Sequence, residues 1–252
     1  MTNWWGQFPC LRSELTDLLI LSDTESTNDK ARELSAFDYL GVITHNQTGG
    51  RGRLGRRWVS SPGEGVALSI VTPNLGPELR SWLPLIAGSA VAQELISRGV
   101  ERVQVKWPND VLIREGKVAG ILCEALPTGR IVVGIGLNVQ FVSDQRPTQH
   151  ARAMSDEIPV SHRDIDQFLG AVVGTIKSYC SLPPGDDFDS LQQFVTSLMG
   201  TLGKKVKVQE GDGLEWRGLA RSLTKEGHLL VEDSVTGELR SVVASDITHL
   251  RQ

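Results

Sequence analysis

Residues 106–110 read Lys-Trp-Pro-Asn-Asp, and residues 117–122 read Lys-Val-Ala-Gly-Ile-Leu. Both lie in short apolar runs that contain β-branched residues and are bounded by turn residues, which is the pattern of strands. The sequence therefore predicts a strand over 103–107, a turn at the proline, and a second strand over 118–123. We expect the polar side chains of the turn to project toward the same site as the lysine that opens the second strand.

A glycine- and arginine-rich segment lies upstream of this pair. Residues 47–58 read Gln-Thr-Gly-Gly-Arg-Gly-Arg-Leu-Gly-Arg-Arg-Trp, which places four arginines among four glycines in a chain with a formal net charge of −4. Glycine lets several backbone N–H groups approach one ligand, and arginine adds a planar set of donors suited to phosphate or carboxylate. The segment is predicted to form a loop that closes over an anion, and a solvated basic loop is the alternative interpretation.

Further short apolar runs predict more strands of the same sheet, over residues 18–21, 41–44, 66–72 and 131–139. A run rich in alanine and leucine predicts a buried helix over 82–98. A capping box at residues 161–164 starts another helix, in which apolar residues recur at helical spacing as far as Ile176. We expect that helix to pack on the sheet.

The pattern changes after residue 183. A short helix is predicted over 188–198, and alternating segments follow at 204–208, 214–223, 228–232 and 239–243. Four or five short strands in a segment of about 50 residues indicate a small barrel. We therefore expect two domains, comprising residues 1–200 and 201–252.

Composition limits the class of protein. The chain has 252 residues, of which 40% are hydrophobic, and lacks the uninterrupted apolar run of about 18 residues that would span a bilayer. The N-terminus has no secretion signal, so a cytoplasmic protein without a membrane partner is expected. Three cysteines without a Cys-x-x-Cys pair argue against a disulfide framework or a cysteine zinc site. A pI near 5.8 argues against broad electrostatic capture of nucleic acid.

The segments 47–58, 106–110 and 117–122, with Gly-Ile-Gly-Leu-Asn at 134–138 and Ser-Thr-Asn at 26–28, together resemble the catalytic domain of the biotin protein ligases. The resemblance implies an α+β fold: a mixed-sheet catalytic domain of the biotin/lipoate protein ligase type and a small C-terminal SH3-like β-barrel. Only about 20 residues precede the first predicted strand, too few for the helix-turn-helix module of operator-binding relatives. A monofunctional ligase without specific DNA binding is therefore expected.

The resemblance also implies a reaction in two steps. First, the biotin carboxylate attacks the α-phosphorus of ATP, which gives biotinyl-5′-AMP and pyrophosphate, usually with Mg²⁺ on the phosphates. Second, a lysine of a biotin carboxyl carrier protein or domain takes the biotin as an amide. ATP, biotin and Mg²⁺ are the implied ligands. A homodimer is common among relatives, although no self-complementary patch is evident in the sequence.

Site residues follow from the same motifs. The resemblance implies that Lys117, Arg51 and Arg53 are catalytic, with Lys117 bridging the biotin carboxylate and the α-phosphate. The uncharged side chains at positions 26, 27 and 47 offer the donors and acceptors that a ureido ring needs. The implied biotin-binding residues are Ser26, Thr27, Gln47, Gly50, Arg51, Lys117 and Gly120. The implied ATP- or adenylate-binding residues are Arg53, Trp58, Lys106, Asn109 and Asn138. Asp110 would order Lys117 or hold Mg²⁺.

Three alternative functions compete with this interpretation of the sequence, and one of them, a ligand-binding module without catalysis, is opposed by the presence of Lys117. A lipoate protein ligase or an octanoyltransferase has the same domain architecture, and fold does not choose between these activities. The Gly-Arg loop and the 106–110 turn favour biotin, and an octanoyltransferase would also need a cysteine in one of the recognised segments. The alternative from another class, a nucleic-acid-binding regulator, is opposed by the acidic net charge and the missing helix-turn-helix.

Overall fold

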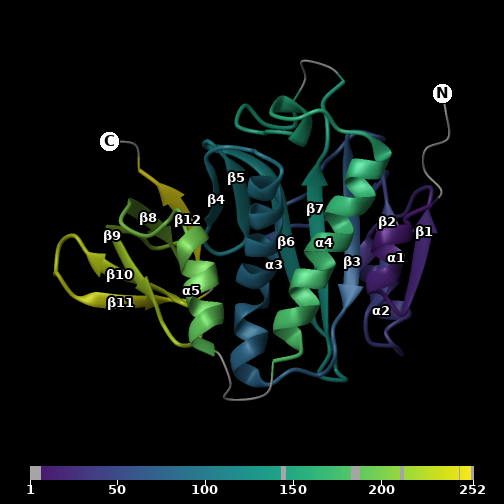
Figure 1. The fold of residues 1–252 in the computed structure, drawn as a ribbon. Coiled ribbons are helices and arrows are strands. Elements are labelled where there is room, and N and C mark those ends of the chain that lie inside the picture. Colours follow the sequence, from purple (N-terminus) through teal and green to yellow (C-terminus); the bar gives the residue numbers. More distant parts are fainter. Residues whose placement is uncertain (1–6, 143–145, 183–187, 211–212, 244, 251–252) are drawn as a thin grey trace.

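The structure is a computed structural model that describes residues 7–142, 146–182, 188–210, 213–243 and 245–250. Within these residues the chain forms a seven-stranded sheet, a five-stranded sheet, and helices that cover the larger sheet (Figure 1). In this part of the chain, no helix is both long and apolar enough to cross a membrane.

The larger sheet is mixed, as the sequence predicts. Its strand order is β1 (Asp17–Leu21), β2 (Leu40–Thr44), β3 (Gly65–Val71), β7 (Ile131–Asn138), β6 (Gly116–Ala125), β5 (Asp110–Ile113) and β4 (Val103–Lys106). Strands β1 and β2 are parallel and are connected through helix α2 (Thr27–Glu33), whereas the other neighbouring strands are antiparallel. The predicted strands of this domain are all present.

Some elements of this domain, among them β5 and α1, were not predicted, and one helix begins earlier than expected. Strand β5 is a four-residue segment that pairs with β4 on one side and β6 on the other, so its stability comes from neighbours that a local pattern does not contain. Helix α1 (Pro9–Glu14) was also missed. Helix α3 (Pro77–Ser97) begins five residues before the predicted start, at a proline in the first turn, where its missing N–H costs no hydrogen bond.

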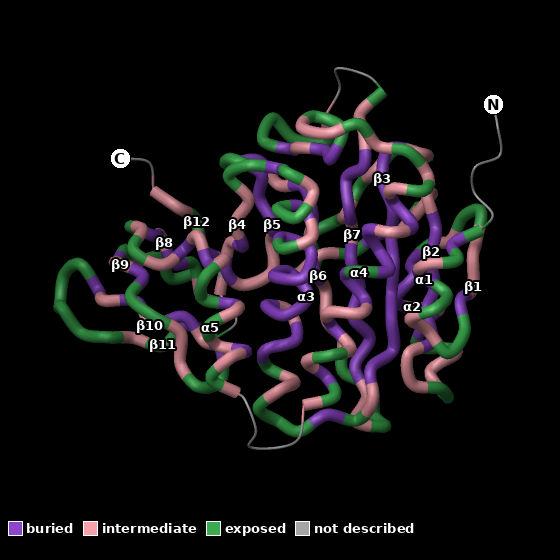
Figure 2. The backbone as a smooth tube through the Cα atoms, in the orientation of Figure 1, coloured by how far each residue is buried: buried purple, intermediate pink, exposed green. Residues whose placement is uncertain are grey.

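The two faces of the large sheet are covered differently. Helices α1, α3 and α4 (His162–Cys180) lie over one face and share its main apolar core, to which Ile70 of β3 and Val133 of β7 belong (Figures 1 and 2). Their neighbours Val71 and Val132 belong to a smaller cluster with Ala31 of α2, because successive side chains of a strand point to opposite faces. The predicted capping box at the start of α4 is present.

The smaller sheet follows helix α5 (Phe188–Leu198) and is antiparallel, as expected for an SH3-like domain. Its strand order is β11 (Leu239–Val242), β10 (Leu229–Asp233), β9 (Glu215–Leu223), β8 (Lys205–Gln209) and β12 (Asp246–His249), and only β12 was not predicted. Two 3₁₀ turns, η1 (Arg53–Gly55) and η2 (Met154–Asp156), complete the described elements.

The smaller sheet is joined to the larger domain by hydrogen bonds from two buried tryptophans. The indole N–H of Trp82 donates to the carbonyl oxygen of Lys225 at 2.8 Å, and that of Trp107 donates to the carbonyl oxygen of Gly227 at 3.1 Å. The turn between β9 and β10 therefore rests against α3 and against the 106–110 turn.

Candidate functional site

A pocket lies on the face of the large sheet that carries α2. Small residues of the three central strands line its floor: Ala67 on β3, Gly134 and Gly136 on β7, and Gly120 on β6. Gly120 and Gly136 are direct cross-strand partners. Because these positions carry little or no side chain on this face, the sheet is hollowed there.

The glycines make room for specific side chains. A Cβ at Gly134 would lie 2.2 Å from Oδ1 of Asn28, and a Cβ at Gly136 would lie 2.5 Å from Cε2 of Trp58. A Cβ at Gly120 would lie 2.9 Å from Nζ of Lys117 and 3.1 Å from Cζ3 of Trp58. The Trp58 ring therefore lies over both paired glycines. Gly120 is one of the residues that the resemblance assigns to biotin binding. In this structure the side chains of Lys117 and Trp58 occupy the space directly above it.

One end of the pocket, which we call the neutral end, consists of Ser26, Thr27, Asn28 and Gln47. Ser26 is the N-cap of α2, since its hydroxyl accepts a hydrogen bond from the backbone N–H of Asp29 at 3.3 Å. Oε1 of Gln47 accepts hydrogen bonds from the backbone N–H of Thr27 at 2.9 Å and from its hydroxyl at 3.1 Å. Helix capping and pocket lining thus coexist at Ser26.

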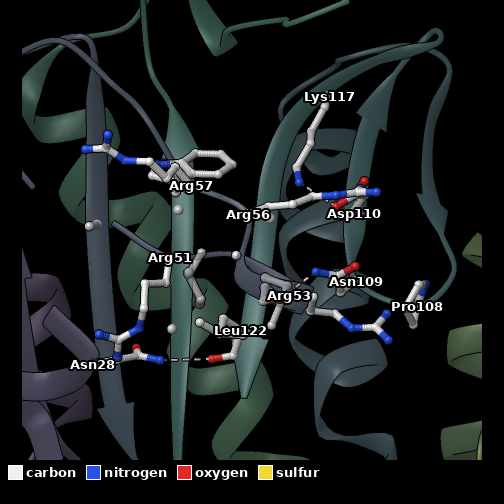
Figure 3. Close-up of a pocket in the computed structure, with 18 of the residues that line it drawn as sticks. Asn28, Arg51, Arg53, Arg56, Arg57, Pro108, Asn109, Asp110, Lys117 and Leu122 are labelled. Atoms are coloured by element: carbon white, nitrogen blue, oxygen red, sulfur yellow. Dashed lines mark hydrogen bonds and ion pairs between the residues drawn. The ribbon is translucent and has the colours of Figure 1, made fainter. Parts of the chain in front are cut away.

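Behind the neutral end lies a polar network that sequence reasoning missed. The hydroxyl of Ser69 is 2.7 Å from Oγ1 of Thr27 and 2.6 Å from Oδ1 of Asn28. The Asn28 amide donates to Oε2 of Glu124 at 2.6 Å and to the carbonyl oxygen of Leu122 (Figure 3). The sequence did contain one indication of this network, a serine among the hydrophobic residues of β3. A buried polar side chain needs hydrogen-bond partners, so Ser69 predicts polar neighbours.

The part of the pocket around Lys117, which we call the cationic end, also contains Arg53, Arg56 and Lys106, and Lys117 and Arg56 lie away from Asn28 (Figure 3). Lys117 points toward Asp110, and its Nζ lies 2.6 Å from Oδ1 of that residue (Figure 3). The same ammonium is 5.4 Å from the centroid of the Trp58 ring. The side-chain amide of Asn109 donates a hydrogen bond to the carbonyl oxygen of Ile121 on β6 at 2.8 Å.

The Gly-Arg segment folds as a hairpin. Trp58 N–H donates to the carbonyl oxygen of Gly50 at 2.9 Å, and Gly52 N–H donates to that of Arg56 at 2.7 Å. The turn η1 forms its tip, where Leu54 and Gly55 have positive φ. We refer to residues 50–58 as the arginine hairpin.

The arginines of this hairpin point in different directions. Arg53 and Arg56 line the cationic end, whereas Arg57 points away from Lys117 (Figure 3). The guanidinium of Arg51 makes a paired contact with the carboxylate of Asp29. That contact lowers the pKa of the Asp29 carboxyl.

Most of the residues implied by the resemblance meet in this pocket. Those that line it are Ser26, Thr27, Gln47, Arg51, Arg53, Trp58, Lys106, Asn109, Asp110, Lys117 and Gly120. Gly50 is buried beneath the lining, where a Cβ would lie 2.5 Å from Nε2 of Gln47. Asn138 also lies outside the lining. Its amide donates to the carbonyl oxygens of Lys117 and Arg152, so it joins the strand that carries Lys117 to the segment after residue 150.

Within the described residues, Asp110 carries the one carboxylate that lines this pocket. Among the described residues, no group of three or more His, Cys, Asp and Glu side chains is arranged to hold a metal ion. The cysteines are free thiols. Burial raises the pKa of the Cys180 thiol to about 12 and also raises the pKa of Cys123, so neither is poised as a thiolate nucleophile.

The chain matches the model of the biotin/lipoate A/B protein ligase family over residues 20–141. It is 31% identical to the biotin–[acetyl-CoA-carboxylase] ligase of Mycobacterium tuberculosis, over 92% of this chain and 88% of that protein. It is 36% identical to the bifunctional ligase/repressor BirA of Salmonella typhimurium, over 86% of this chain and 69% of that protein. The fold is similar to that of the biotin protein ligase from Aquifex aeolicus solved in complex with biotin and ATP, with a TM-score of 0.76 and 24% identity, over 94% of this chain and 100% of that one.

Proposed function

Because this chain belongs to the biotin protein ligases of the biotin/lipoate A/B protein ligase family, we propose that it activates biotin as biotinyl-5′-AMP and transfers it to a lysine of a biotin carboxyl carrier protein or domain. The observation that carries this proposal is the division of one pocket into a neutral end and a cationic end. The neutral end offers both donors and acceptors to a ureido ring, and the cationic end offers charge to a carboxylate and a phosphate.

In the first step, an oxygen of the biotin carboxylate attacks the α-phosphorus of ATP. The new O–P bond forms as the bond to the pyrophosphate oxygen breaks, and pyrophosphate leaves with that electron pair. Two anions meet in this step, so the transition state gains most from cations that are already in place. We assign this task to Lys117, which Asp110 orients, together with Arg53 and the other cations of the pocket.

In the second step, the ε-amine of the acceptor lysine attacks the acyl carbon of the adenylate. The amide bond forms, the C–O bond to AMP breaks, and the proton that the amine loses is taken up by the released phosphate of AMP. Water would destroy the mixed anhydride before the acceptor arrives. The arginine hairpin lies over the pocket and is suited to exclude water from it.

The residues present fit a Mg²⁺ ion that arrives with the nucleotide. Mg²⁺ commonly binds through one or two carboxylates and substrate phosphates, and the pocket offers a single carboxylate, Asp110, beside the amide of Asn109. When bound, the ion would neutralise charge on the phosphates. Lys117 and the arginines still have to place the biotin carboxylate.

The test is acid-dependent exchange of labelled pyrophosphate into ATP by the purified protein. Biotin, lipoate and octanoate are each supplied separately as the acid. We expect exchange with biotin and little with the other two, because a hydrocarbon or dithiolane tail forms no hydrogen bonds with the polar side chains of the neutral end. Equal turnover with lipoate would contradict the assignment. A second assay should follow transfer of labelled biotin to a purified biotin carboxyl carrier domain.

A further inference from the structure

The Arg51 side chain is committed to two carboxylates. Its Nη1 and Nη2 lie 2.5 and 2.6 Å from the two oxygens of Asp29, and Nη2 also lies 3.6 Å from Oε1 of Glu124. Both carboxylates have a second arginine in common, since Arg32 lies 2.8 Å from Asp29 and 3.1 Å from Glu124. Two carboxylates and two guanidinium groups thus form a charge-balanced cluster.

This cluster joins three elements of the pocket. Asp29 lies in the first turn of α2, directly after the residues of the neutral end. Glu124 lies on β6 and also accepts a hydrogen bond from the amide of Asn28. Arg51 lies at the base of the arginine hairpin, paired across its stem with Arg57. The base of the hairpin is therefore attached to helix α2, which carries residues of the neutral end, and to strand β6.

We propose that Asp29, supported by Glu124, is a positioning residue that holds the arginine hairpin over the pocket through Arg51. This inference rests on the proposed function. It changes the role expected for Arg51, which acts as the tether of the hairpin, while arginines nearer the tip face the ligand anions. A planar guanidinium paired with both oxygens of one carboxylate would have to give up two hydrogen bonds to reach a ligand.

The strength of the tether suits a lid that must open. The side chains of Arg51 and Asp29 are 41% and 39% exposed, and pairs of such exposure contribute at most about 1 kcal/mol, or roughly fivefold in an equilibrium. A contact of this size favours the closed hairpin but still allows substrates to enter and products to leave. It is also weakened by salt.

The test measures the dissociation rate of preformed biotinyl-5′-AMP from Asp29→Asn, Arg51→Gln and the double variant. We expect each single substitution to accelerate release by roughly two- to fivefold, and the double variant to be no faster than either, since all three break the same contact. Asp29→Glu should restore part of the retention. The difference from the unmodified protein should shrink at high salt.

The matched control is Arg32→Gln, which removes the other arginine of the cluster without touching the hairpin. It should release the adenylate at nearly the normal rate. If Arg51→Gln accelerates release and Asp29→Asn does not, or if their effects multiply, then Arg51 contacts the ligand directly and the tether is refuted.

A second readout separates this inference from the proposed function. Trypsin cleavage after Arg53, Arg56 and Arg57 reports opening of the hairpin without any substrate. Cleavage should be faster in Asp29→Asn than in Arg32→Gln, and equal rates would overturn the tether. If the unmodified protein makes no biotinyl-5′-AMP, the proposed function fails, and the cleavage rates still decide the tether.

Discussion

Lys117 has one carboxylate and one aromatic ring as close neighbours, and both come from other parts of the chain. Asp110 contacts the ammonium directly, and the Trp58 ring lies on the glycines beside it. A lysine ammonium is a compact charge that contacts two different acceptors more readily than a planar guanidinium does. These contacts orient the charge of Lys117 in the pocket before any substrate arrives.

We expect Lys117→Ala to reduce adenylate formation far more than biotin binding. Its charge is needed most where the carboxylate meets the α-phosphate, and loss of one preorganised donor costs on the order of 10² to 10³ in rate, or roughly 3 to 4 kcal/mol. Pyrophosphate exchange and a biotin titration of the same variant measure the two effects.

Two further measurements bear on Lys117. Lys117→Arg should rescue poorly, because the charge of arginine is spread over a planar guanidinium and lies at a different position from the compact lysine ammonium. The alanine variant should also be supplied with chemically made biotinyl-5′-AMP. We expect Lys117→Ala to slow transfer from this adenylate to the acceptor less than it slows the overall reaction. Near-normal adenylate synthesis by Lys117→Ala would show that Lys117 takes no part in the first step.

At the scale of elements, the smaller sheet supports the turn that presents Asn109 and Asp110. The backbone N–H of Trp107 donates to the buried hydroxyl of Thr201 at 3.0 Å, and that hydroxyl lies 3.0 Å from Nε2 of His249 on β12. Because the hydroxyl accepts from Trp107, its own proton is available to a neutral imidazole nitrogen. The segment before β8 and the last strand thus position the 106–110 turn.

We expect Thr201→Val to destabilise the protein by about 1 to 3 kcal/mol, because it leaves the buried N–H of Trp107 without a partner. Adenylation should also slow, since the turn that carries Asp110 is less constrained. Urea unfolding and pyrophosphate exchange would show both effects. Thr201→Ser keeps the hydroxyl and should behave like the unmodified protein. Unchanged stability of the valine variant would mean that this hydrogen bond is dispensable.

At the scale of the whole molecule, the junction between the two sheets makes stability depend on pH. Burial, reinforced by Lys204 and Lys106, lowers the pKa of His249 from its usual 6.5 to about 4. As the pH falls below 6.5, His249 therefore takes up a proton in the unfolded chain but stays neutral in the folded chain until the pH nears 4. The stabilising contribution is complete above pH 6.5 and is lost as the pH falls toward 4.

The expected loss is about 1 to 2 kcal/mol between pH 7 and pH 4.5, after allowance for screening at a partly exposed ring. Urea unfolding should be measured across this pH range. The free energy of unfolding should decline less steeply with falling pH in His249→Gln than in the unmodified protein, because glutamine does not titrate. Other titrating groups affect both proteins equally, so the difference between the two curves isolates His249. Parallel curves would show that its protonation does not influence folding.

Local patterns were sufficient for much of the fold. Alternating and β-branched runs predicted the central strands, and the capping box predicted the start of α4, because neighbours within a few residues produce these features. Strands β5 and β12 were missed. Each is four residues long and exists because it pairs with strands whose proximity the local sequence does not specify.

The same distinction applies to the site. The motifs identified residue types suited to biotin, carboxylate and phosphate, and most of those residues line one pocket. Sequence did not reveal that Arg51 is bound by Asp29 and Glu124, or that the amide of Asn138 is used on backbone carbonyls.

The sequence by itself determined the family, the alternation of elements and the chemical types available for the reaction. Only the tertiary structure decided which of the arginines that line the pocket is held by carboxylates. It also decided that Trp58 lies over Gly136 and that the smaller sheet supports the 106–110 turn. The physical reason is that side-chain direction and charge pairing depend on groups far apart in the chain, which become neighbours only when the sheets and helices pack.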